Sequence, residues 1–241
     1  MNIAGIATEL QTGQGYAVLP ELITRERAHE ARNIILALAG EDRAAGRLIT
    51  QHSRWRLRLT GRGDIFMELA SHDLIRQVAS TMLGDGFVMG GLSAHALTKG
   101  AAPQGVHVDY PYSVMREPFP EPPLQVQAIW VLDEFTAGNG ATRVLPHSQK
   151  TRRRPDRQEF YANSTPIHCP AGSLILSHGG LWHDSSTNRT DEPRIAILGN
   201  YTPFWVRSVE GLTGNAKEFR NALMKALAWK RQNKDAVKPP Y

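Results

Sequence analysis

The chain has 241 residues, of which 41% are hydrophobic, and its formal net charge is +5. This length and composition are typical of one globular domain, and no apolar run approaches the roughly 18 residues that cross a bilayer. The single cysteine, Cys169, excludes an internal disulfide and a cysteine-based zinc site. The positive charge fits either nucleic acid or a small acidic ligand and does not decide between them.

The N-terminal residues MNIAGIATELQTGQG lack the basic and apolar regions of a secretory signal. Together with the lone cysteine, this predicts a cytoplasmic protein. The excess charge gathers in RRR, residues 152–154, and in KRQNK, residues 230–234. Such runs are typical of solvated loops and helix ends, so nucleic acid is not the expected partner.

The N-terminal part, to about residue 85, is expected to be mainly helical. GYAVLPEL, residues 15–22, predicts a short strand, and a helix should follow from a Thr24 N-cap to a C′ glycine at Gly40. A second helix is expected from a Ser71 cap to its stop at Gly84.

Between these two helices, SRWRLRLTG, residues 53–61, alternates as a strand does. One face would carry Trp55, Leu57 and Leu59, and the other Arg54, Arg56 and Arg58. We expect the arginine face to be solvated. Contact with an anionic substrate is the alternative for Arg56 and Arg58, and also for Arg116.

From about residue 86 to 205, strand-like runs recur between Gly, Pro and Asn residues. They lie at residues 87–97, 105–112, 125–133, 141–146, 165–177 and 193–201. Short strands at this spacing predict a β-sandwich or barrel rather than βαβ units. The expected organisation is one domain of 1–241, with a helical part (about 1–85), a β core (about 86–205) and a C-terminal helix (about 214–235).

The stretch GVHVDYPYS, residues 105–113, places His107 and Asp109 two residues apart in an extended segment, where both side chains lie on one face. Alone, this pair is compatible with a local hydrogen bond. A third ligand is His183, which follows an apolar strand and a Gly-Gly turn, and His178 is the weaker candidate for that place. Two histidines and one carboxylate leave about half of an octahedral coordination sphere free, as in non-haem Fe(II) oxygenases.

Arg194 lies eleven residues after His183, at the start of the next expected strand. A keto acid that chelates iron at one end needs its distal carboxylate held, and a guanidinium can do so through two parallel hydrogen bonds. The sequence therefore predicts an iron site with a keto-acid co-substrate.

In the order and spacing of these residues, the chain resembles the phytanoyl-CoA dioxygenase-like branch of the Fe(II)/2-oxoglutarate oxygenases. The likeness extends over roughly residues 14 to 205 and includes QVQAIWVLDEFTAGNGATRVLPHSQK, residues 125–150. It implies a mainly β protein with a double-stranded β-helix core, a jelly-roll and cupin relative, in which Fe(II) is bound by His107, Asp109 and His183. It further implies that O2 is a co-substrate and that 2-oxoglutarate is held by Arg194, Ser185 and Gln127.

The chain departs from the family pattern at two places. Ile129 stands where many relatives have tryptophan, and PHSQ, residues 146–149, replaces Pro-Gly-Ser-His. Neither change touches the iron ligands, so both concern substrate preference. Asp109 is present where halogenating relatives carry a small residue, which favours oxygen transfer or hydrogen abstraction over halogenation. The aromatic candidates for the substrate pocket are Tyr110, Tyr112 and Trp182.

The expected activity is oxidation, by default hydroxylation, of a small molecule in natural-product or amino-acid metabolism. Desaturation, ring closure and epoxidation are alternative outcomes of the same chemistry. A non-catalytic cupin-type barrel stays open but does not account for Arg194. A zinc hydrolase would lack an HExxH-type motif, and a nucleic-acid demethylase would lack an aromatic and basic stacking surface. No membrane partner is expected, and the oligomeric state is not determined.

Overall fold

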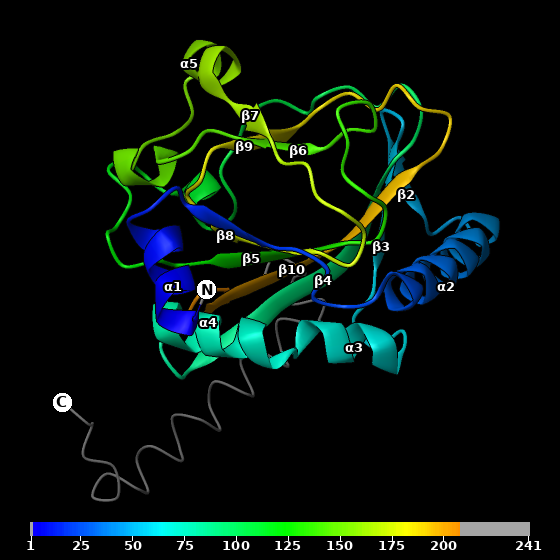
Figure 1. The fold of residues 1–241 in the computed structure, drawn as a ribbon, viewed down its shortest axis with the longest axis horizontal. Coiled ribbons are helices and arrows are strands. Elements are labelled where there is room, and N and C mark those ends of the chain that lie inside the picture. Colours follow the sequence, from blue (N-terminus) through cyan, green and yellow to red (C-terminus); the bar gives the residue numbers. More distant parts are fainter. Residues whose placement is uncertain (1, 208–241) are drawn as a thin grey trace, which may run out of the picture.

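Two antiparallel sheets face each other in the computed structural model, which describes residues 2–207 (Figure 1). The larger sheet contains β1 (Tyr16–Leu19), β2 (Ile49–Gln51), β3 (Arg54–Arg58), β4 (Phe87–Leu97), β5 (Val126–Val131), β8 (Leu174–His178) and β10 (Arg194–Pro203). The smaller sheet contains β6 (Thr142–Val144), β7 (Thr165–Pro166) and β9 (His183–Ser185). Over the described residues, the strand orders are β1-β8-β5-β10-β4-β3-β2 and β7-β6-β9.

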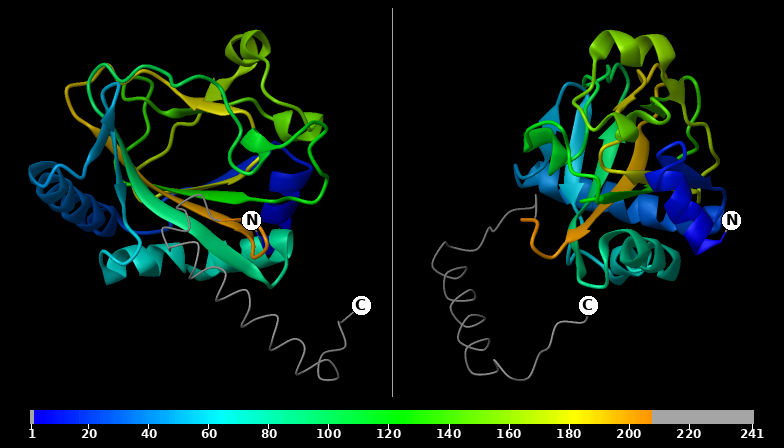
Figure 2. Two further views of the ribbon diagram at one scale, coloured as in Figure 1. Left: turned by 180° about the vertical axis from the view of Figure 1, so that it is seen from behind. Right: turned by 90° about the vertical axis from the view of Figure 1, so that its left-hand side faces the viewer.

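Helices cover the larger sheet on the side away from the smaller one. They are α1 (Ile3–Gln11), α2 (Arg25–Ala44), α3 (Asp64–Ala70) and α4 (Asp73–Leu83), and Figures 1 and 2 show α3 and α4 beneath the sheet. The short helix α5 (Arg157–Asn163) lies instead beyond the smaller sheet. Within residues 2–207, no helix has both the length and the apolar character that a membrane span requires.

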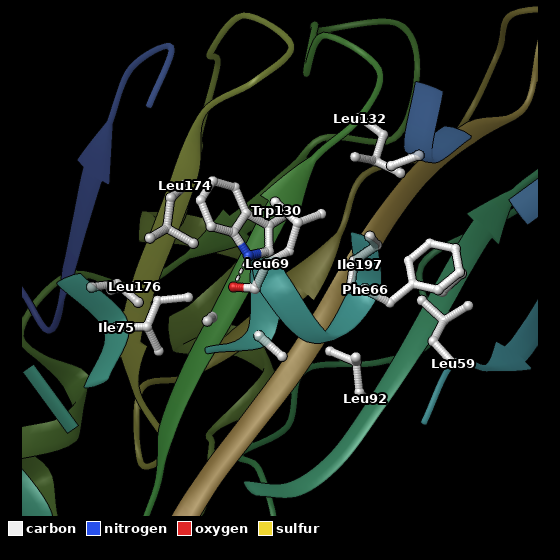
Figure 3. Close-up of a cluster of buried hydrophobic side chains, with 14 of the residues drawn as sticks. Leu59, Phe66, Leu69, Ile75, Leu92, Trp130, Leu132, Leu174, Leu176 and Ile197 are labelled. Atoms are coloured by element: carbon white, nitrogen blue, oxygen red, sulfur yellow. Dashed lines mark hydrogen bonds between the residues drawn. The ribbon is translucent and has the colours of Figure 1, made fainter. Parts of the chain in front are cut away.

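The outer face of the larger sheet and these helices form the main hydrophobic core. Alternate strand residues point to this face, among them Trp130 and Leu176, which are at most 1% exposed. Figure 3 shows them packed with Phe66 and Ile75 from α3 and α4. The indole Nε1 of Trp130 donates a hydrogen bond to the carbonyl of Leu69 at 3.1 Å, which ties β5 to α3.

The inner face of the larger sheet forms a second, smaller core. Ile129, Val131 and Ile175 occupy the strand positions between the outer-face residues, and they pack with Val144 of β6. Because helices cover the outer face, polar side chains on the inner face are the ones that can line a shared cavity between the sheets.

Several predicted elements are confirmed, and β4 occupies residues 87–97 as expected. Thr24 is the N-cap of α2, and its side chain accepts from the backbone N–H of Arg27 at 3.2 Å. The prediction that α2 ends at Gly40 is wrong, because the helix continues to Ala44. Its last turn is anchored by Asp42, which is 5% exposed and accepts hydrogen bonds from two arginines, Arg47 and Arg62.

Other boundaries differ from the sequence prediction. Ser71 ends α3, which was not predicted, and His72 is the N-cap of α4. Helix α1 was not predicted either. The N-terminal part also contributes β1, β2 and β3 to the larger sheet, so it is not merely a helical addition to a β core. The helix predicted at about 214–235 lies outside the described residues.

We expect Trp130→Ala to lower the free energy of unfolding by about 3–5 kcal/mol, because it leaves a large cavity in the main core. Trp130→Phe keeps most of the volume but leaves the Leu69 carbonyl without its donor, which should cost about 1–3 kcal/mol. Urea unfolding measures both changes. Trp205→Ala is the matched control, because that side chain is 64% exposed and its loss should change stability by less than about 0.5 kcal/mol. Equal effects at the two positions would contradict this assignment of the core.

Candidate metal and co-substrate site

The segment that carries His107 and Asp109 lies antiparallel to the strand that carries His183. The backbone N–H of each histidine donates to the carbonyl of the other at 3.0 Å, and Asp109 N–H donates to Gly179 at 2.9 Å. Residues two apart in such an extended segment point to the same side. The pairing therefore brings three side chains together from positions that are about 75 residues apart in the chain.

One ligand atom from each of His107, Asp109 and His183 lies within 4.8 Å of the others. The Nε2 atom of His183 is 3.7 Å from Asp109 Oδ1, and the two imidazole rings have centroids 4.3 Å apart. In both histidines, Nδ1 is 2.9 Å from a backbone carbonyl, that of Gly105 and that of Leu181. A carbonyl only accepts, so Nδ1 carries the hydrogen and Nε2 keeps its lone pair for a metal.

The electrostatic environment favours the metal-binding form of His107. Burial, and then the neighbouring His183, lower the pKa of His107, which keeps this imidazole neutral. Gln125 Nε2 lies 3.3 Å from Asp109 Oδ2 and also donates to Gln127 Oε1 at 2.8 Å. Gln125 was not singled out from the sequence. It is 1% exposed and orients the carboxylate from the position just before β5.

A cavity of about 550 Å³ lies beside this cluster, between the two sheets. All three side chains of the cluster line it. So do Ser185, Gln127 and Arg194, which the family resemblance assigned to the co-substrate. The remaining wall is partly apolar and includes Ile129, Ile175 and Leu198.

Arg194 forms one closed end of the cavity. The residue is 4% exposed, its Nη2 donates to the carbonyl of Gly140 at 2.5 Å, and its guanidinium lies 4.3 Å from the ring centre of Phe135. Its Nε is buried and has no hydrogen-bond partner among the described residues. Burial, and then the nearby cation of Arg54, lower the pKa of Arg194 to about 9.

Arg54 is a second buried cation at this end. In the strand register, Leu97 of β4 lies opposite Arg54 of β3 on one side and opposite Arg194 of β10 on the other. The three side chains therefore share the inner face of the sheet. Arg54 Nη2 donates to Ser185 Oγ at 2.7 Å and to the Ala102 carbonyl, while its Nε is buried without a partner in residues 2–207.

The prediction that Arg54 lies on a solvated face is wrong, because it is 8% exposed. The alternation of β3 was interpreted correctly, but the pairing with β4 turns the arginine face toward the cavity. Neither Arg54 nor Arg194 forms an ion pair with a described carboxylate. This end of the cavity is therefore chemically suited to a carboxylate ligand.

The aromatic residues predicted for the substrate pocket divide into two groups. Tyr110 lines a cavity of about 480 Å³ that adjoins the first. Tyr112 and Trp182 line neither cavity. Tyr112 is 1% exposed and its hydroxyl accepts from Leu124 N–H at 2.7 Å, whereas Trp182 is fully buried and its Nε1 donates to the Arg153 carbonyl at 3.0 Å.

The basic run at residues 152–154 has structural partners. Arg152 donates to the Phe119 carbonyl and pairs with Glu121, and Arg153 pairs with Glu159. Arg154 donates to the Met115 carbonyl at 3.0 Å. Arg152 and Arg154 thus hold the 115–121 loop, and Arg153 contacts α5, so the run does not form a free cationic surface.

Two further histidines are neutral, His178 in a buried and His95 in a partly buried position. The weaker ligand candidate, His178, accepts a hydrogen bond from Gly180 N–H at its Nδ1 and is not part of the cluster. Burial lowers its pKa to about 4. His95 lines the cavity with Nε2 3.0 Å from Ser93 Oγ, and burial followed by the nearby Arg56 lowers its pKa to about 3.

We expect stability to fall as the pH decreases from about 6.5 to about 4, because the unfolded state then binds protons that folded His178 does not. This residue should account for about 3 kcal/mol of the loss. His178→Gln should reduce the dependence of the unfolding free energy on pH in this window, as measured by urea unfolding at several pH values. His29→Gln, on the exposed face of α2, is the control. An unchanged slope in His178→Gln would contradict burial of a neutral imidazole.

Comparison with known proteins agrees with this site. The family model for phytanoyl-CoA dioxygenase (PhyH) matches residues 13–196. The uncharacterized protein Rv1501 of Mycobacterium tuberculosis is 25% identical over 200 residues, covering 78% of this chain and 71% of its own. Dioxygenase af480 of Aspergillus fumigatus is 33% identical over 128 residues, 52% of this chain and 40% of its own.

Among solved structures, the epimerase SnoN in complex with Fe3+, alpha ketoglutarate and nogalamycin RO superposes with a TM-score of 0.65. The two chains are 19% identical, and the match covers 89% of this chain and 88% of SnoN. The expected fold, a double-stranded β-helix with flanking helices, is thereby confirmed. The chain belongs to the phytanoyl-CoA dioxygenase family, as the sequence resemblance predicted.

Proposed function

We propose that the chain is an Fe(II)- and 2-oxoglutarate-dependent dioxygenase that oxidises a small molecule, by default through hydroxylation. The observation that carries this proposal is the position of His107, Asp109 and His183 in the same cavity as two buried arginines that lack a carboxylate partner among the described residues. We also propose a cytoplasmic location, in line with the free, buried thiol of Cys169.

The donor set fits a ferrous ion. Two imidazoles and one carboxylate, converging from one side, form the ligand type of non-haem iron oxygenases and leave coordination positions for other ligands. The backbone carbonyls that fix both Nδ1–H groups, and Gln125 next to Asp109, hold the three donors in place. We therefore assign His107, Asp109 and His183 as the iron ligands.

The arginine end fits the far carboxylate of 2-oxoglutarate. Arg194 and Ser185 would hold this carboxylate, as the family resemblance implies. Arg54 adds a second cation and fixes the Ser185 hydroxyl. The unpartnered Nε atoms of both arginines support this assignment, because a buried donor without a partner is costly until a ligand supplies an acceptor.

When bound, Fe(II) and 2-oxoglutarate supply the means to activate O2, with succinate and carbon dioxide as the co-products. The remaining residues position the reactants. Gln127 lines the cavity together with Ile129, Ile175 and Leu198, and these three apolar side chains limit access of water. SnoN is named an epimerase, so this fold also supports outcomes other than hydroxylation.

We expect His107→Ala and His183→Ala each to weaken metal binding by at least about 100-fold, because each removes one of three ligands. Isothermal titration with Ni(II), a redox-stable substitute, measures this loss, and succinate release under Fe(II) and 2-oxoglutarate should disappear in parallel. His29→Ala is the matched control, since His29 is exposed on α2. Metal affinity equal to that of the unmodified protein in either ligand variant would refute the assignment.

We expect Arg194→Ala to raise the dissociation constant for 2-oxoglutarate by about 100-fold, because a buried, charge-assisted contact contributes about 2–5 kcal/mol. Arg54→Met should raise it by about 10-fold through loss of one cation and of the Ser185 contact. Titration of 2-oxoglutarate into the Ni(II)-loaded protein measures both constants. Arg76→Ala, whose side chain is 62% exposed on α4, should bind as the unmodified protein does. A constant unaltered by Arg194→Ala would place the anchor elsewhere.

A further inference from the structure

The loop that carries His107 into the site has no regular structure of its own. Residues 101–106 lie in no helix or strand, and the loop ends at His107, which pairs with His183 of β9. Gly105 has a φ of +104°, in the left-handed region that favours glycine. The direction of the His107 imidazole depends on this turn, because its Nδ1–H donates to the Gly105 carbonyl at 2.9 Å. The turn therefore needs contacts from elsewhere in the fold to keep its shape.

One buried carboxylate supplies contacts to this turn. Asp184 is 2% exposed and lies on β9, between His183 and Ser185. Its Oδ1 accepts from the backbone N–H of Gln104 at 3.0 Å, and its Oδ2 accepts from the N–H of Gly105 at 3.2 Å. A side chain that follows one metal ligand in the chain thus holds the turn that orients the other imidazole.

Both oxygens of this carboxylate accept a second hydrogen bond. Oδ1 of Asp184 accepts from Ser185 N–H at 2.7 Å, and Oδ2 accepts from the hydroxyl of Tyr161 at 2.6 Å. Tyr161 belongs to α5, beyond the smaller sheet (Figure 1). Four donors therefore converge on two oxygens. A carboxamide has only one oxygen and cannot accept from all four, so the position requires a carboxylate.

Other contacts hold the loop nearer its beginning. Arg54 Nη2 donates to the Ala102 carbonyl, and Asn188 N–H donates to the carbonyl of the residue before Ala102 at 3.1 Å. Both contacts lie at least three residues before Gly105. The bond from the Gly105 N–H to Asp184 is therefore the contact made at the turn itself.

We propose that Asp184 is a positioning residue of the metal site: it holds the Gly105 turn, and the turn fixes the Nδ1–H of His107. Tyr161 in turn holds the carboxylate from α5. This assignment rests on the proposed function, because it takes His107 as a metal ligand. A hydrogen bond to the second ring nitrogen sets the orientation and the basicity of a metal-binding imidazole. Asp184 therefore acts on the metal only through His107.

Asp184→Asn tests this role because it removes one hydrogen bond selectively. The new amide has to keep its oxygen toward the N–H groups of Gln104 and Ser185, which can only donate. Its Nδ2 then takes the place of Oδ2. The hydroxyl of Tyr161 can reverse and accept from Nδ2, but the N–H of Gly105 cannot. The substitution therefore releases the turn while the other contacts of the side chain remain.

The full-length protein loaded with Co(II) reports on both imidazoles. Unpaired electrons of the metal shift the Nδ1–H proton signals of bound histidines away from all others, so His107 and His183 should give one such signal each. His107→Ala, at excess Co(II), should keep only the signal of His183 and thereby assigns the pair. In Asp184→Asn, the His107 proton should exchange with solvent about tenfold faster. The His183 proton should not change, because its partner is the Leu181 carbonyl. Affinity for Ni(II), measured by isothermal titration, should fall by about tenfold.

Two tyrosine variants separate positioning from general loss of stability. Tyr161→Phe, at a half-buried position, should accelerate exchange of the His107 proton in the same selective way but less strongly. Tyr201→Phe is the matched control, because its hydroxyl donates to the Ala70 carbonyl at 2.6 Å in the main core. Its loss lowers stability and should leave both signals unaltered. An unchanged His107 proton in Asp184→Asn and Tyr161→Phe, or equal acceleration of both protons, would overturn the assignment.

A metal-free measurement keeps this result apart from the proposed function. Absence of shifted signals in the unmodified protein would refute the metal site. Hydrogen exchange of the Gly105 amide in the metal-free protein then tests the contact alone, and we expect it to be about tenfold faster in Asp184→Asn. Equal exchange of this amide in both proteins would show that Asp184 does not hold the turn.

Discussion

The site depends on one backbone interaction, the antiparallel pairing of His107 with His183. Two hydrogen bonds of 3.0 Å fix this register, and the bond from Asp109 N–H to Gly179 extends it. A shift by one residue would turn every side chain of one segment to the opposite face. The convergence of three ligand side chains is therefore a consequence of backbone register, which the rest of the structure has to maintain.

The aromatic residues beside the ligands maintain it. Trp182 immediately precedes His183 and points to the other side of the segment, where it is fully buried. Its backbone N–H donates to Ser148 Oγ at 2.9 Å, and its carbonyl accepts from Leu145 N–H at 3.0 Å. Tyr112 supports the loop after Asp109 in a similar way. These side chains position the ligands from behind, so proximity in sequence to a ligand does not imply a place in the pocket.

This difference shows what the sequence can and cannot predict. His107, Asp109, His183 and Arg194 were found because residue type and spacing along the chain express their chemistry directly. Gln125, just before β5, and Arg54, on β3, were not, because their roles depend on which face of each segment meets the cavities. The face is determined by pairing with strands 40 or more residues away in the chain. One example is Arg54 on β3, which lies opposite Leu97 on β4. Periodicity in the sequence divides the residues of a strand between two faces. Only the pairing of strands in the sheet determines which of these faces meets the cavity.

The two faces of the larger sheet have opposite energetic roles. Its outer face packs against four helices in an apolar core, which is the main source of stability. Its inner face carries the buried guanidiniums of Arg54 and Arg194 without a carboxylate partner among the described residues, an arrangement that costs stability. Since neighbouring strand residues alternate between the faces, the same strands both stabilise the fold and present the costly charges. Binding of an anion at the inner face then recovers part of that cost, which couples ligand binding to stability.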